Sequence, residues 1–208
     1  CAYGEGVEGM RIRVHDRDTG LWLDAGGGWS GLPHAFAPDV LEPVGVFAAG
    51  ADITEFGGPE EAATVGAAFR RALDGVAAIP RPVIAAVNGV ALGGGFEIAL
   101  ACDLVIAAEG TRFLTAYDRI GASPDCGSTY YLPRVMGPRR SAQFYLLGET
   151  LDTQEAQRLG LVSEVVDDEG LDTALEHLVH ALLQNGPLAV RQAKQLVHDV
   201  AGHPITPA

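Results

Sequence analysis

The chain has 208 residues, of which 48% are apolar and 20% are charged, as expected of one folded globular domain with a full core. Its net charge of −13 at pH 7 argues against nucleic acid and against an anionic membrane surface as partners. The sequence has no apolar run that would span a bilayer and no basic-then-apolar signal pattern. The widely spaced Cys1, Cys102 and Cys126 form no metal motif, which favours reduced thiols and a cytoplasmic protein.

Residues 1–45 are rich in glycine and proline, and we expect no helix there. The alternating segment 11–14 (RIRV) predicts a short strand. Segment 26–31 fits the spacing GxGxxG, but Pro33 follows where the helix of a dinucleotide site would run, so we expect no such site.

From Val44 onward, short apolar runs alternate with segments of helical periodicity. Strands are expected at 44–47, 83–87, 104–107, 112–114 and 162–166. Helices are expected at 59–78, 96–101, 138–147, between Asp152 and Gly160, at 171–183 and at 187–200. Alternation of this kind predicts an α/β fold with a parallel sheet and helices outside it.

The most informative stretch is segment 88–103 (NGVALGGGFEIALACD), in which three glycines join an apolar run to a helix. Glycine allows backbone dihedrals that other residues avoid and lets a ligand approach the main chain. A helix start offers unpaired N–H groups and a partial positive charge. The joint therefore suits stabilisation of an oxyanion, and Glu97 lies about one turn further on, where an acid or base could act.

A second segment, 47–53 (FAAGADI), lies upstream, and the two together resemble the signature segments of the crotonase superfamily (enoyl-CoA hydratase/isomerase). The segments Pro133-Arg134 and 156–162 (AQRLGLV) are also similar to that family. The resemblance implies that the backbone N–H groups of Ala51 and Gly94 hold the thioester oxygen of an acyl-CoA. It further implies a substrate-binding set around the first segment: Ala49, Ala51, Asp52, Ile53, Thr54 and, from the second segment, Gly94.

The resemblance also implies a crotonase-like ββα spiral over residues 46–208, with an atypical N-terminal part (1–45) and a shortened C-terminal helical region. Residues 1–45 are either a divergent N-terminus or the product of a shifted or rearranged reading frame. The implied substrate is an acyl-CoA, with no cofactor besides the CoA of the substrate itself. The implied assembly is a homo-oligomer, a trimer or a dimer of trimers.

Glu97 matches the first catalytic glutamate of hydratases, and a carboxyl group in an apolar pocket can exchange protons near neutrality. The second glutamate is missing, because its position is occupied by Tyr117. Asp118 is acidic, but in an extended segment it would point the other way. Asp125 stands where many hydratases have glycine, which resembles the members that isomerise double bonds; its alternative role is to cap the helix that follows.

We therefore expect an enzyme that acts on an acyl-CoA through an enolate, with isomerisation of a double bond preferred. Simple hydration of a 2-enoyl-CoA and non-catalytic binding of acyl-CoA are the alternatives. Glu176, His177 and His180 share a helix face, but a pair of histidines at this spacing is common and we expect no metal site.

Overall fold

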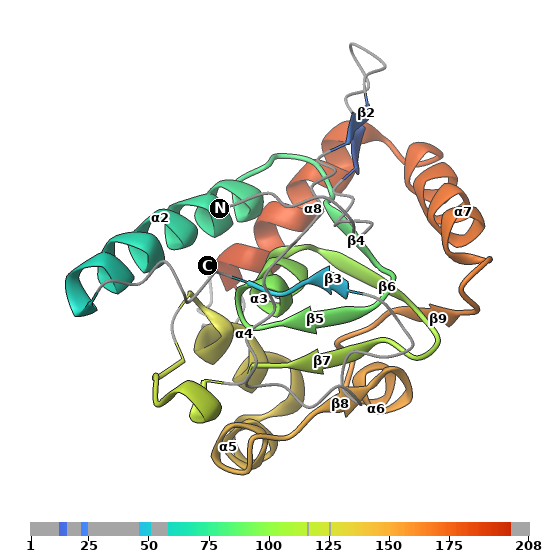
Figure 1. Ribbon diagram of the computed structural model, residues 1–208. Coiled ribbons are helices and arrows are strands. Elements are labelled where there is room, and N and C mark those ends of the chain that lie inside the picture. Colours follow the sequence, from blue (N-terminus) through green and yellow to red (C-terminus); the bar gives the residue numbers. More distant parts are fainter. Residues whose placement is uncertain are drawn as a thin grey trace.

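The computed structural model describes residues 13–15, 22–24, 46–50, 58–115, 117–124 and 126–200. Two mainly parallel sheets form the centre of this part of the chain (Figure 1). One sheet has the order β3 (Val46–Ala48), β5 (Val90–Leu92), β7 (Arg112–Leu114) and β8 (Leu151–Asp152), and β8 alone runs antiparallel to its neighbour. The other sheet has the order β4 (Ile84–Val87), β6 (Leu104–Ala108) and β9 (Glu164–Val166), all parallel.

A separate antiparallel pair lies in the N-terminal part. It consists of β1 (Arg13–His15) and β2 (Trp22–Asp24), with Arg13 opposite Asp24. The strand predicted at 11–14 is thus found with its bounds shifted toward the C-terminus. The other predictions for residues 1–45 lie outside the described residues.

The helices surround the sheets (Figure 1). They are α2 (Pro59–Ala77), α3 (Gly94–Ala101), α4 (Ser128–Met136), α5 (Pro138–Leu146), α6 (Thr153–Arg158), α7 (Leu171–Leu183) and α8 (Pro187–Val200), with a 3₁₀ turn η2 (Asp118–Ile120). In the described residues, no helix is both long and apolar enough to cross a membrane.

Local sequence explains where several helices begin. Proline occupies the first turn of α2, where its missing N–H leaves no hydrogen bond unmade. The side chain of Asp152 caps α6 by accepting a hydrogen bond of 2.8 Å from the backbone N–H of Glu155. The predictions for α2, α6, α7 and α8 are confirmed, because each of these helices carries a clear periodicity or a start signal.

The main core packs around α3. Phe96 is 1% exposed and contacts two further aromatic rings, Phe113 at 5.4 Å and Phe144 at 6.2 Å between centroids. In a second apolar cluster, α7 packs against β4 and β6 through Ile84, Ile106 and Leu175. The helix α3 is therefore enclosed, and its first turn is held in place by the aromatic cluster.

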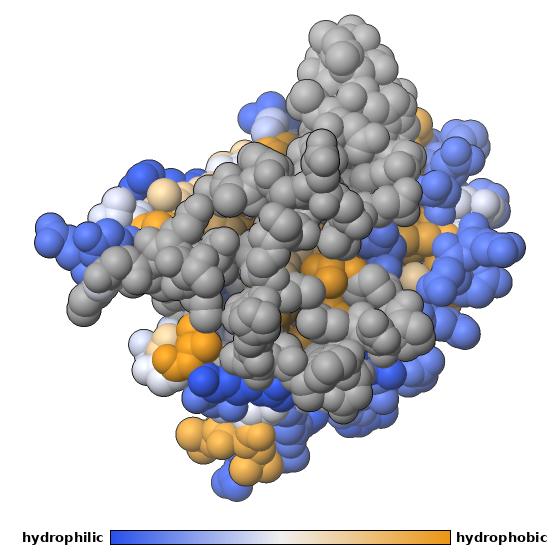
Figure 2. Space-filling model, viewed as in Figure 1, coloured by the Kyte–Doolittle hydropathy of each residue, from blue (hydrophilic) through white to orange (hydrophobic). Residues whose placement is uncertain are grey.

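Helix α5 is amphipathic, and only one of its faces joins the core. Phe144 is fully buried, whereas Leu146 and the following Leu147 are 82% and 70% exposed. Figure 2 shows apolar side chains at the molecular surface in the region of α5.

Cys102 ends α3 and packs against the core. Its Sγ donates a hydrogen bond to the carbonyl oxygen of Ile98 at 3.3 Å. Burial raises the pKa of the thiol to about 12, so the group stays protonated at neutral pH. These properties fit the predicted role of a small core residue.

Asp103 fixes α8 to the edge of the β4 sheet. Its Oδ2 accepts hydrogen bonds from the backbone N–H of Val83 and from Lys194 Nζ, both at 2.7 Å. Lys194 Nζ also donates to the carbonyl oxygen of Arg81 at 3.0 Å, and His198 Nε2 lies 3.0 Å from Asp103 Oδ1. The side chains of Lys194 and Asp103 are only 8% and 15% exposed, so water screens the pair weakly.

We expect Gly95→Ala to destabilise the fold by about 3 kcal/mol, because a Cβ at this position would overlap the carbonyl group of Ala48. Gly75→Ala is the matched control, since a Cβ at Gly75 meets nothing within 4 Å and should stabilise α2 by up to about 1 kcal/mol. Urea unfolding followed by circular dichroism measures both changes. Equal stabilities of the two variants would contradict the close approach of α3 to β3.

We expect Lys194→Met to lower the free energy of unfolding by about 2 kcal/mol, because it leaves the largely buried Asp103 with one fewer charged partner. The control is Arg70→Gln, which removes an ion pair with Asp74 whose side chains are 57% and 60% exposed. That variant should change stability by less than about 0.5 kcal/mol. A Lys194→Met protein as stable as Arg70→Gln would show that Asp103 does not hold α8.

Candidate active site

The glycine-rich joint connects β5 to α3. Gly93 has φ 52° and ψ −122°, a conformation with positive φ that residues with a side chain rarely adopt. Its backbone N–H donates to the carbonyl oxygen of Leu114 on β7 at 2.9 Å. Gly94 then begins α3, so its N–H belongs to the first turn, where a helix has no carbonyl of its own to offer.

The end of β3 lies directly against this joint. Gly50 has φ 81°, and a Cβ built on it would lie 2.8 Å from the backbone nitrogen of Gly94 and 3.1 Å from the carbonyl oxygen of Leu92. The two signature segments, which the sequence separates by about forty residues, therefore meet backbone to backbone at Gly50 and Gly94. The predicted donor Ala51 is the next residue along the chain and lies outside the described residues.

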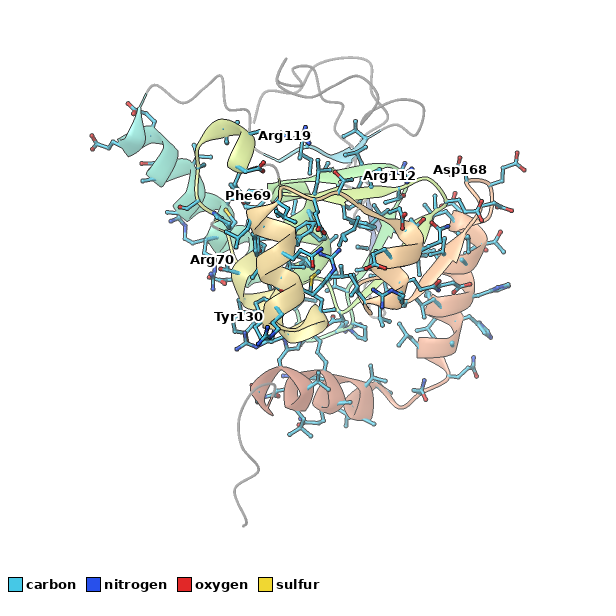
Figure 3. All side chains as sticks on the ribbon, turned by 90° about the horizontal axis from the view of Figure 1, so that it is seen from below. Phe69, Arg70, Arg112, Arg119, Tyr130 and Asp168 are labelled. Carbon is cyan, nitrogen blue, oxygen red and sulfur yellow. The ribbon has the colours of Figure 1, made fainter. Side chains whose placement is uncertain are left out.

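Helix α2 encloses Gly94 from another side. A Cβ on Gly94 would meet Cζ of Phe69 at 2.8 Å, so the ring packs closely on the helix start. Figure 3 shows Phe69 and Arg70 on α2, and Arg70 is near enough to Tyr131 of α4 to interact with it electrostatically. Glycine at position 94 thus leaves room for the ring of Phe69.

Glu97 lies in the first turn of α3 and is fully buried. Its Oε1 accepts a hydrogen bond from the Tyr117 hydroxyl at 3.0 Å and one from the backbone N–H of Ser128 at 3.3 Å. Burial alone disfavours a charged carboxylate, whereas both donors favour it. The first turns of α3 and α4 also bring the positive ends of two helix dipoles to the same carboxyl group.

Two further hydroxyl groups lie beside this carboxyl group. Burial raises the pKa of Tyr145 to about 12, the Ser128 hydroxyl opposes that shift, and the nearby charge of Glu97 adds to it. Neither Ser128 Oγ nor the Tyr145 hydroxyl has a hydrogen bond of standard geometry to another described residue, although both are buried. Sequence analysis missed both residues, because a serine and a tyrosine without a motif carry no signal.

The structure places Ala49, Gly94 and Glu97 of the predicted site together around the joint. Ala49 follows β3 and is 8% exposed. The remaining predicted residues lie outside the described ones: Ala51, Asp52, Ile53, Thr54 and Asp125. Glu176, His177 and His180 are exposed on α7, and within the described ranges no three His, Cys, Asp or Glu residues gather as metal ligands.

Two sequence predictions around the site need correction. The joint follows β5 rather than the strand expected at 83–87, because Val90–Leu92 forms a short strand of its own. Asp118 lies in the turn η2 and not in an extended segment. Gly127 is the N-cap residue of α4, and the role of Asp125, as proton-handling group or as helix cap, stays a prediction because Asp125 lies outside the described residues.

Comparison with known proteins agrees with this geometry. The chain is 40% identical over 124 residues to the 1,2-epoxyphenylacetyl-CoA isomerase of Escherichia coli, covering 60% of this chain and 47% of the relative. It is 41% identical over 154 residues to the 2,3-dehydroadipyl-CoA hydratase of the same organism, covering 74% and 60%. The chain thus spans about half to three fifths of the length of these curated relatives.

Solved structures give the same result. An enoyl-CoA hydratase from Bacillus anthracis superimposes with a TM-score of 0.71 at 37% identity, covering 74% of this chain and 60% of that one. A protein from Thermobifida fusca solved in complex with CoA superimposes with a TM-score of 0.70 at 31% identity, covering 77% and 66%. Residues 42–204 match the family described as enoyl-CoA hydratase/isomerase, and the chain belongs to this family with its crotonase fold.

Proposed function

We propose that the protein isomerises the double bond of an enoyl-CoA thioester through an enolate. The observation that carries the proposal is the fully buried Glu97, which lies one turn from the Gly94 N–H and accepts a hydrogen bond from the phenol of Tyr117. Relatives named as an isomerase and as a hydratase of CoA thioesters support the substrate class.

The reaction begins when Glu97 takes a proton from C2 of a 3-enoyl-CoA. The electron pair of the broken C–H bond forms a double bond between C1 and C2, and the thioester oxygen takes the negative charge. A proton is then delivered to C4 by the carboxyl pair of Glu97 and Asp125. The C3–C4 π pair forms the new C–H bond, the C1–C2 pair moves to C2–C3, and the C1 carbonyl is restored, so the carboxyl pair ends with the protons it began with.

The enolate is the costly species, and the glycine joint is suited to stabilise it. The N–H groups of Gly94 and Ala51 are the proposed donors to the thioester oxygen. The close packing of Gly50 on Gly94 supports this pairing, because Ala51 directly follows Gly50 in the sequence. Donors fixed in the backbone need no reorganisation as charge develops, which is why such sites accelerate reactions strongly.

Tyr117 favours isomerisation over hydration. Hydration requires a group that takes a proton from water, whereas the phenol of Tyr117 donates its hydrogen bond to Glu97 and offers no second base. Isomerisation only moves a proton between two carbons of the substrate. Asp125, by resemblance, is the second proton-handling group, and Ala49, Asp52, Ile53 and Thr54 are the proposed lining of the CoA site. A homo-oligomeric assembly and a cytoplasmic location stay predictions.

We expect Gly94→Pro to lower kcat by at least about 100-fold, because proline has no N–H to donate to the enolate oxygen. Gly94→Ala is the matched control: it places the same Cβ against Phe69 but keeps the N–H, so the difference between the variants isolates the donor. Initial rates with 3-enoyl-CoA measure this difference, after circular dichroism has shown that both variants fold. Equal rates for the two variants would rule out the donor role of Gly94.

We expect conversion of 3-enoyl-CoA to 2-enoyl-CoA to be faster than hydration of 2-enoyl-CoA, and Asp125→Asn to suppress the isomerisation by about 100-fold or more. Both reactions are followed by chromatography of the acyl-CoA products. Asp167→Asn, on an exposed turn before α7, is the control and should leave both rates unchanged. Fast hydration that is indifferent to Asp125→Asn would instead identify the protein as a hydratase.

A further inference from the structure

We propose that Tyr117 is a positioning residue that fixes Oε1 of Glu97, so that Oε2 is the oxygen that exchanges the proton with the substrate. This inference rests on the proposed function and goes further, because it assigns a role to a residue at which the resemblance implies only a missing carboxyl group. The contact that carries it is the hydrogen bond of 3.0 Å from the phenol to Oε1.

The backbone holds the phenol in place. The carbonyl oxygen of Tyr117 accepts hydrogen bonds from the N–H groups of Ile120 at 3.2 Å and of Ala122 at 3.0 Å, which close the turn η2 around it. Tyr117 itself is half-buried, while residues 118–120 are exposed. Tyr117 therefore links the exposed turn η2 to the buried Glu97, and its own main chain is held by that turn.

A second donor reaches the same oxygen from α4. The backbone N–H of Ser128 lies 3.3 Å from Oε1 of Glu97. Cys126 and Gly127, the two residues before it, have φ values of 44° and 108°. Such a conformation is rare for a residue with a side chain and persists where the surroundings require it. Here the turn aims the first N–H of α4 at the carboxyl group.

Because both donors reach Oε1, the two oxygens of the Glu97 carboxyl group have different roles. An oxygen that already accepts from an O–H and an N–H group is the poorer proton acceptor of the two, because a proton on it weakens both hydrogen bonds. We therefore assign proton transfer to Oε2. Tyr145 also lies near the carboxyl group, and its pKa of about 12 keeps it a neutral phenol over the range in which the enzyme would work.

The test compares Tyr117→Phe with the wild type in the isomerisation of 3-enoyl-CoA. We expect kcat to fall by about 10-fold to 100-fold, as for the loss of one hydrogen bond to a charged group, with KM changed less than about twofold. Loss of the donor also makes the carboxyl group harder to ionise, so the acidic limb of the kcat–pH profile moves to higher pH. The kcat–pH profile of Asp125→Asn shows which part of the acidic limb comes from Asp125, and the remaining part belongs to Glu97.

Tyr130→Phe is the matched control, because Tyr130 is a 45% exposed tyrosine on α4, and it should leave kcat and the profile unchanged. A Tyr117→Phe protein with wild-type kcat overturns the inference. So does one whose kcat falls while the pH profile stays in place, since that result describes a purely structural role.

Exchange of the substrate's C2 protons with D₂O distinguishes failure of this inference from failure of the proposed function. If the wild type exchanges these protons and Glu97→Gln does not, the result supports the proposed function. The kcat and pH profile of Tyr117→Phe then test the inference separately. Absence of exchange in the wild type, or exchange that persists in Glu97→Gln, overturns the proposed function and the inference together.

Discussion

The close approach of two backbone segments governs this structure. A Cβ on Gly95 would overlap the Ala48 carbonyl group, and one on Gly50 would lie 2.8 Å from the Gly94 nitrogen. Only glycine at both places lets the end of β3 rest on the first turn of α3. Because the packing is backbone on backbone, it fixes the position of the Gly94 N–H more rigidly than side-chain contacts would, and rigidity is what an oxyanion donor requires.

The first turn of the same helix carries Glu97, and other groups of the site offset the free-energy cost of burying its charge. A fully buried carboxyl group is costly to ionise unless hydrogen bonds and favourable dipoles compensate. The phenol of Tyr117, the first N–H of α4 and the first turn of α3 all act in that direction. The positive φ of Cys126 is the local strain that accompanies this arrangement, and Gly127 continues the turn without strain.

Much of the fold could be predicted from the sequence where a signal is local. The bounds of α7 and α8 follow from apolar residues at helical spacing and from Pro187, and both were predicted to the residue. The strand β5 was missed because three apolar residues beside a glycine run show no period. The contact between Glu97 and Ser128 joins positions 31 residues apart, and no local pattern encodes it. Resemblance identified Gly94 and Glu97, whereas Ser128 and Tyr145 required the three-dimensional structure.

Position 117 is where this chain carries a phenol in place of the carboxyl group that the family resemblance implies. A carboxylate there would accept a proton and would repel the charge on Glu97, so that one of the two groups would be forced to stay protonated. The phenol of Tyr117 donates instead, which stabilises the charge on Glu97 and removes the second base. The fold needs neither property, because the main chain around Tyr117 is held by its own turn η2. The proposed isomerisation requires only that a proton move within the substrate, which suits a buried carboxyl group that accepts a hydrogen bond from an adjacent phenol.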